Sequence, residues 1–189
     1  AGLAPGLAGF PVTDVDPDAD PQTARVLAIT AGIMRLKVIE EVRETLGATY
    51  SPSANVSMSG LYPGFGYVSA GAEVKPQDAD EVIRALEKIA ASMRAGEISD
   101  DEFNRAITPS LEVLPQNATS NAYWLGLIAQ AQSRPDLMER SKIAAIEKSV
   151  RAVTKTDVIA AANEWLTDAA AQEVRVVPGP GAGRKPAQD

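Results

Sequence analysis

An arginine and a tyrosine flank a corner in the segment Val42–Val56, which reads VRETLGATYSPSANV. The segment begins as the charged end of a helix and finishes as a polar, alternating strand. One helical turn followed by a reversal at Gly47 can bring Arg43 and Tyr50 to the same end of a sheet. A guanidinium orients negative charge and a phenol hydroxyl donates a hydrogen bond, so the two side chains could reach one ligand. The alternative is a cation that suits the helix dipole beside an ordinary strand tyrosine.

Histidine and cysteine are both absent from the sequence. Their absence excludes an imidazole general base, Ser-His-Asp and Cys-His arrangements, and every zinc site built from histidine, with or without cysteine. It also excludes a disulfide framework. The compartment stays open between periplasm and cytoplasm, because a cysteine-free chain folds equally well in oxidising or reducing surroundings.

Carboxylates alone could still hold Mg²⁺ or Ca²⁺, and the stretch Thr13–Asp20, TDVDPDAD, is the obvious candidate. It lacks the loop glycine and the distal glutamate of an EF-hand, and its proline suits an extended segment, so we expect a solvated loop there. A carboxylate-metal hydrolase that uses Asp14–Asp20 is the alternative. The remaining paired carboxylates sit at helix ends or on exposed faces, where the helix dipole accounts for negative charge in a first turn.

The composition describes a globular chain rather than a nucleic-acid or membrane protein. Its 189 residues are 45% hydrophobic, which suits one domain with a real core. A net charge of −7 without a basic stripe argues against nucleic acid as a partner. No apolar run approaches the roughly 18 to 20 residues of a membrane span, and no signal peptide is visible.

Hydrophobic spacing and turn residues predict the elements that must position the Arg/Tyr pair. Asp20 and Pro21 start a helix over 21–46, which Gly47 ends. Strands over 49–58 and 65–74 form an antiparallel hairpin, in which Pro52 argues for an edge position or a bulge. A helix over 76–94 follows, and the Ser99–Glu102 capping box starts another, which should kink or break at Pro109 and Pro115. The remaining elements are helices over 119–132, 134–148 and 155–166 and a last strand over 173–178.

This order predicts an α+β fold, with an antiparallel sheet and helices packed on one face. We expect residues 21–178 to form the domain and residues 179–189 to form a disordered tail. Residues 1–20 are a linker or a truncated first strand, for which only GFPVTDV, residues 9–15, offers a weak pattern.

The residues RETLGATYS, from Arg43 to Ser51, resemble the Arg/Tyr segment of the pitrilysin (insulin-degrading enzyme-like, inverzincin) zinc metallopeptidases. The likeness covers roughly residues 20–180, since it continues through the preceding helix, the hairpin, the helix starts at Ser99 and Thr154, and the closing strand. In that family, homologous α+β domains close like a clamshell. One half carries the zinc motif H-x-x-E-H, and the other lacks the metal and contributes an arginine and a tyrosine to the substrate.

The resemblance implies that this chain is the metal-free C-terminal domain of such a peptidase, inactive alone. Arg43 and Tyr50 would then assist catalysis from across the cleft, with no cofactor in this chain and zinc on the partner domain. The implied partners are the zinc-bearing homologous domain or subunit and a peptide substrate. The alternative is a non-enzymatic scaffold or interaction subunit of the same fold, in which the Arg/Tyr pair is incidental.

Overall fold

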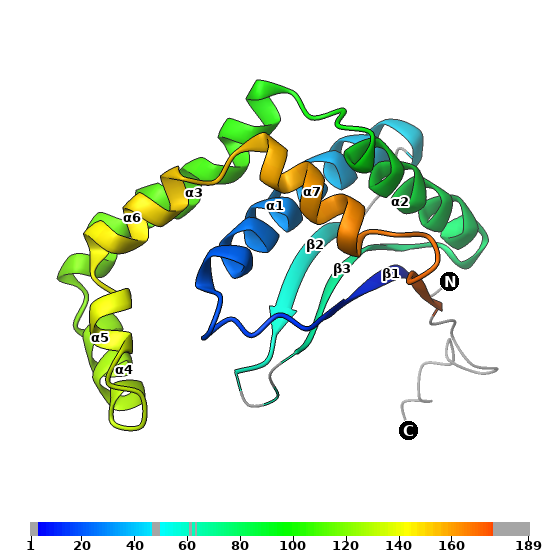
Figure 1. Ribbon diagram of the computed structural model, residues 1–189. Helices are drawn as coiled ribbons and strands as arrows, with labels where there is room; N and C mark the ends of the chain where they lie inside the picture. Colours follow the sequence, from blue (N-terminus) through cyan, green and yellow to red (C-terminus); the bar gives the residue numbers. More distant parts are fainter. Residues whose placement is uncertain (1–3, 47–49, 61, 63, 176–189) are drawn as a thin grey trace, which may run out of the picture.

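The computed structural model describes residues 4–46, 50–60, 62 and 64–175. The chain folds into one sheet, a helical layer and a helical arm (Figure 1). The elements in chain order are β1 (Ala4–Thr13), α1 (Pro21–Leu46), β2 (Tyr50–Met58), β3 (Phe65–Val74), η1 (Pro76–Asp78), α2 (Ala79–Arg94), α3 (Asp100–Thr119), α4 (Asn121–Ala131), α5 (Leu137–Arg140), α6 (Ile143–Arg151), α7 (Lys155–Trp165) and β4 (Gln172–Arg175).

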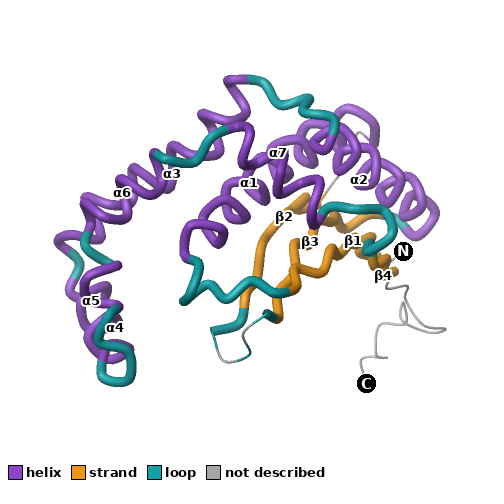
Figure 2. The backbone as a smooth tube through the Cα atoms, in the orientation of Figure 1, coloured by secondary structure: helices purple, strands orange, loops and turns teal. Residues whose placement is uncertain are grey.

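The four strands form one antiparallel sheet in the order β2-β3-β1-β4. Helices α1, α2 and α7 cover one face of this sheet (Figure 2). The predicted α+β architecture, with helices on one face of an antiparallel sheet, is therefore confirmed.

The core lies between the sheet and the helical layer. Side chains alternate along β3, so that Val68 and Val74 are buried against the helices while Phe65 and Tyr67 are exposed on the opposite face. Helix α1 contributes the largest share of fully buried side chains from the helical layer, namely Leu27, Ile33, Met34, Val38 and Val42. An amphipathic helix needs a continuous apolar side of this kind to remain on a sheet.

Residues 4–13, which the sequence left open between a linker and a first strand, form β1. This strand pairs along its whole length with β3 and also pairs with β4, so it lies inside the sheet. Its glycine, alanine and proline content weakens the strand pattern. Burial of Phe10 and Val12 against the helices stabilises it nonetheless. The tail predicted over 179–189 lies outside the described residues.

The sequence predicted a kink or a break of the third helix at its prolines. The break is wrong, because α3 continues through both Pro109 and Pro115. Each proline removes one backbone donor and frees the carbonyl four residues earlier. Only Leu114 is buried in this helix, so water can satisfy the freed carbonyl groups. Helix α3 can therefore tolerate two interior prolines that a buried helix could not.

The helix predicted over 134–148 is divided into α5 and α6. Ser141 and Lys142 separate the two helices, and the Tyr123 hydroxyl donates a hydrogen bond of 3.0 Å to the Ser141 carbonyl oxygen. Helices α3 and α6 lie side by side and lead to α4 and α5 at the far end of the arm (Figure 1). The division at Ser141 thus lets the chain turn back along α3.

We predict that two glycine-to-alanine substitutions change stability in opposite directions. Gly96 follows α2 with φ +79°, and an added Cβ would lie 3.3 Å from Ile159. Gly96→Ala should lower the free energy of unfolding by about 1–2 kcal/mol, because alanine is strained in the left-handed region. Gly126 lies inside α4 with open space around it, so Gly126→Ala should raise stability by about 0.5–1 kcal/mol. Urea unfolding monitored by circular dichroism measures both, and equal signs would contradict this account.

Candidate functional site

The backbones of Arg43 and Tyr50 lie on the two sides of one corner. Arg43 belongs to the last turn of α1, and Tyr50 is the first residue of β2, paired with Glu73 of β3. Both side chains, and residues 47–49 between the two elements, lie outside the described part of the structure. The shared role of the two side chains therefore stays a prediction.

Strand β2 lies at one edge of the sheet, and its pairing with β3 is irregular near Tyr50. Tyr50 pairs with Glu73, but Ser53 pairs with Gly71, so β2 has one extra residue in this interval. The sequence predicted an edge position or a bulge from Pro52, and the structure has both. A bulge of this kind bends a strand and ends regular pairing beside it.

The outer edge of β2 presents backbone groups that β3 does not use. The Ser59 amide donates to the Phe65 carbonyl oxygen at 2.9 Å, which identifies this pair as a hydrogen-bonded one. Because bonded and non-bonded pairs alternate in an antiparallel ladder, the N–H and C=O groups of Ala54, Val56 and Met58 point away from β3. No described strand pairs with this edge. An extended peptide can add to an edge of this kind.

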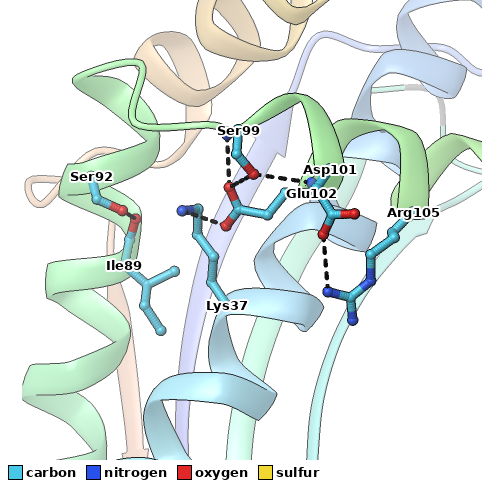
Figure 3. A network of polar contacts seen from close by, with 7 residues as sticks. All are labelled: Lys37, Ile89, Ser92, Ser99, Asp101, Glu102 and Arg105. Atoms are coloured by element: carbon cyan, nitrogen blue, oxygen red, sulfur yellow. Dashed lines mark hydrogen bonds and ion pairs between the residues drawn. The ribbon is translucent and has the colours of Figure 1, made fainter.

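A polar network fixes the start of α3 on α1 (Figure 3). The Lys37 ammonium lies 2.7 Å from Glu102 Oε1, and each side chain is only 16% exposed. Glu102 Oε2 accepts hydrogen bonds from the Ser99 amide and hydroxyl at 2.7 and 2.8 Å, and the Glu102 amide donates to Ser99 Oγ at 3.1 Å. The predicted capping box is therefore confirmed, and it extends to a lysine on another helix.

This network borders a polar cleft of about 270 Å³ between α1 and α2. Glu40, Glu41, Lys88 and Glu97 also line it, and Lys88 pairs with Glu41 at 2.9 Å. Burial raises the pKa of the Glu102 carboxyl, but the hydrogen bonds from Lys37 and Ser99 outweigh it and hold that pKa below its usual value. A carboxylate kept ionised in this way is a poor proton acceptor, so the network fits a structural role.

The acidic stretch Asp14–Asp20 makes local hydrogen bonds and one ion pair with a residue distant in the sequence. Asp16 Oδ1 accepts a hydrogen bond from the Asp18 amide at 2.8 Å, and Asp18 forms an ion pair with Arg134. Asp20 accepts from the Thr23 amide at 3.0 Å, which confirms it as the cap of α1. In the described ranges, no group of three or more histidine, cysteine, aspartate or glutamate side chains is placed to hold a metal ion. The described residues therefore offer no carboxylate cluster that would support the alternative of a carboxylate-metal hydrolase.

A family model described as "Peptidase M16 inactive domain" matches residues 8–109, more than half of the chain. The chain belongs to this family. The resemblance to pitrilysin-type peptidases is thereby confirmed, and the M16 match includes both Arg43 and Tyr50. Lys37 also lies inside it, but no local sequence signal connects Lys37 with Glu102 on a later helix.

The relatives of this chain include a much longer curated protein and solved structures of similar fold. The chloroplastic stromal processing peptidase of rice, Oryza sativa, is 27% identical over 107 residues, which are 57% of this chain and 8% of the rice protein. A structure of an inactive peptidase domain from Bordetella parapertussis has a TM-score of 0.69 at 20% identity, and covers 96% of both chains. An M16-like peptidase from Alicyclobacillus acidocaldarius has a TM-score of 0.74 at 17% identity, covering 95% of this chain and 42% of its own. This chain thus spans a small share of the curated relatives that it matches.

Among the described residues, no helix combines the length and the apolar character that a membrane span requires.

We predict that Glu102→Gln lowers the free energy of unfolding by about 1.5–3 kcal/mol at pH 7, because a charge-assisted hydrogen bond to the half-buried Lys37 is lost. Since the folded-state pKa of Glu102 lies below its ordinary value of 4.5, its contribution is present above pH 4.5 and is lost as the pH falls through the lowered pKa. The difference between the two proteins should therefore shrink below about pH 4.5. Urea unfolding between pH 7 and pH 3 measures it.

The matched control is Glu112→Gln, which changes an exposed carboxylate on the same helix with no ion pair among the described residues. This control should stay within about 0.5 kcal/mol of the parent at every pH. A Glu102→Gln difference that does not depend on pH would refute the assigned ion pair.

Proposed function

We propose that this chain is the metal-free C-terminal domain of a pitrilysin-type zinc metallopeptidase. It binds the peptide substrate and supplies Arg43 and Tyr50 to the active site of a zinc-bearing half, and it is inactive alone. The observation that carries the proposal is the family match across residues 8–109, which includes the corner where α1 ends and β2 begins.

The chemistry of the two side chains suits the proposed role. A tyrosine hydroxyl at Tyr50 donates a hydrogen bond to a peptide carbonyl oxygen as that oxygen becomes an oxyanion. A guanidinium at Arg43 orients the substrate and balances nearby negative charge. The zinc ion of the partner half, when bound there, supplies an activated water.

Peptide binding is supported by the free edge of β2. The outward N–H and C=O groups of Ala54, Val56 and Met58 can pair with an extended substrate as another strand would. Backbone pairing tolerates many side chains. The bulge between Tyr50 and Ser53 lies where such a strand would approach the Arg/Tyr corner.

We predict that Tyr50→Phe lowers kcat about 100- to 1,000-fold in the assembled enzyme, in which this chain is joined by the zinc-bearing half, fused or separate. The substitution removes one hydroxyl and keeps the ring, and KM should change little because the bond forms in the transition state. Cleavage of fluorogenic peptides measures both constants. Tyr67→Phe on the exposed face of β3 is the matched control and should leave kcat unchanged.

The same assay separates the peptidase domain from a scaffold. The lone chain, supplied with zinc, should cleave nothing, whereas the assembled enzyme should show cleavage that a chelator abolishes. Chelator-sensitive cleavage by the lone chain would contradict the proposal. A normal rate for Tyr50→Phe would favour the scaffold or interaction subunit, in which the pair is incidental.

A further inference from the structure

A groove of about 270 Å³ lies beside the free edge of β2, where α1 and α3 approach that strand. Residues 54–56 form its strand side. In Figure 2, α3 and the arm extend from the helical layer on the side of the sheet where β2 lies. The groove is smaller than the roughly 300–1,000 Å³ of small-molecule pockets, so it suits a single side chain of a larger ligand.

The charged residues among the described lining are both arginines, Arg35 of α1 and Arg105 of α3. Arg35 is exposed and makes no ion pair within the described residues. Arg105 lies 3.4 Å from Asp101 one helical turn away, and the two side chains are 58% and 75% exposed (Figure 3). Exposed pairs of this kind are worth little, so Arg105 can exchange Asp101 for another carboxylate.

Small residues let α1 and α3 approach each other closely beside the groove. A Cβ added to Gly32 of α1 would lie 3.4 Å from the Cβ of Ala106 on α3. Both residues line the groove. The backbones therefore approach closely, and the long arginine side chains define the charged surface.

A peptide on the β2 edge would direct every second side chain toward the helix side of the sheet, where this groove lies beside Ala54 and Val56. Ala54, Val56 and Met58 present their free backbone groups outward and their side chains toward α1. In a pleated sheet, directly opposed residues share a face. A guest residue opposite Ala54 or Val56 therefore projects its side chain to the helix side, where Arg35 and Arg105 lie.

We propose that this groove selects an acidic side chain of the extended peptide bound on the β2 edge. The inference rests on the proposed function, because it assumes that the peptide adds to this edge. Charge complementarity supports it: the chain carries a net charge of −7, yet the charged lining here is cationic. Two guanidinium groups can hydrogen-bond one carboxylate, whereas a neutral amide gains less.

The distance from Tyr50 fixes where in the substrate the acidic residue lies. The groove begins at Ala54 and ends at Val56 along β2. With a rise of about 3.3 Å per residue, the groove lies roughly 13–20 Å from Tyr50 along the strand. The bulge shortens this distance slightly. If Tyr50 acts at the cleaved bond, the acidic residue lies about four to six residues away from that bond.

The test uses the 189-residue chain and a capped ten-residue Thr/Val/Ala host peptide with a fluorescent label. One Glu is moved through its positions, and each peptide has a Gln twin. Fluorescence anisotropy should give at least one position where Glu binds about three- to fivefold more tightly than Gln at low salt. The double variant Arg35→Gln with Arg105→Gln should abolish this preference and leave the Gln peptides unaffected. Arg84→Gln, an exposed arginine of α2 outside the groove lining, is the control and should keep it.

A second peptide series separates the two levels of the proposal. N-methylation of alternate amides in the host peptide should abolish binding if the peptide adds to the β2 edge. If N-methylation abolishes binding but no position prefers Glu, or the preference survives the double variant, the acidic selectivity is wrong and the peptide site stands. If no peptide binds, or N-methylation has no effect, edge binding and the acidic selectivity both fail.

Discussion

Helix α1 lies across one face of the sheet, and the burial of its apolar side sets the position of every feature that could do chemistry. Ile33, Met34 and Val38 are each completely buried against the core. Burying such side chains contributes about 1.5–3 kcal/mol each, so α1 cannot rotate or shift without a large loss. Its outer side then has a fixed direction, with Lys37 toward α3 and Arg35 toward the edge of β2.

Local signals in the sequence were enough to predict where several of the helices begin and that β2 is an irregular edge strand. Asp20 and Pro21 mark the start of α1, because capping groups and backbone restrictions act within a few residues. The capping boxes at Ser99 and Thr154 are local in the same sense, and both are present in the structure. Pro52 correctly indicated the edge and the bulge, since a residue without an N–H can only sit where the ladder does not need one.

Features that depend on contacts distant in sequence could not be predicted in this way. Strand β1 has weak intrinsic preference and is specified by pairing with β3, more than fifty residues later. Solvent exposure, which the local pattern does not report, allows α3 to continue past its prolines. Lys37 pairs with Glu102, and Arg35 and Arg105 line one groove, because α1 packs against α3. The corner between α1 and β2 could therefore be predicted from the sequence, whereas the groove beside it could not.

The bulge in β2 connects the corner with the groove in the proposed function. The segment of β2 from Ser53 to Met58, which pairs regularly with β3, would hold an extended peptide through its outward backbone groups. Arg35 and Arg105 would fix the register of that peptide through one acidic side chain. Register needs such a device, because backbone hydrogen bonds alone repeat every two residues and permit slippage. Between Tyr50 and Ser53 the ladder is interrupted, so a guest strand would lose its pairing there and could turn toward the opposite half. A metal-free domain can thus determine which bond is presented without carrying out the chemistry itself.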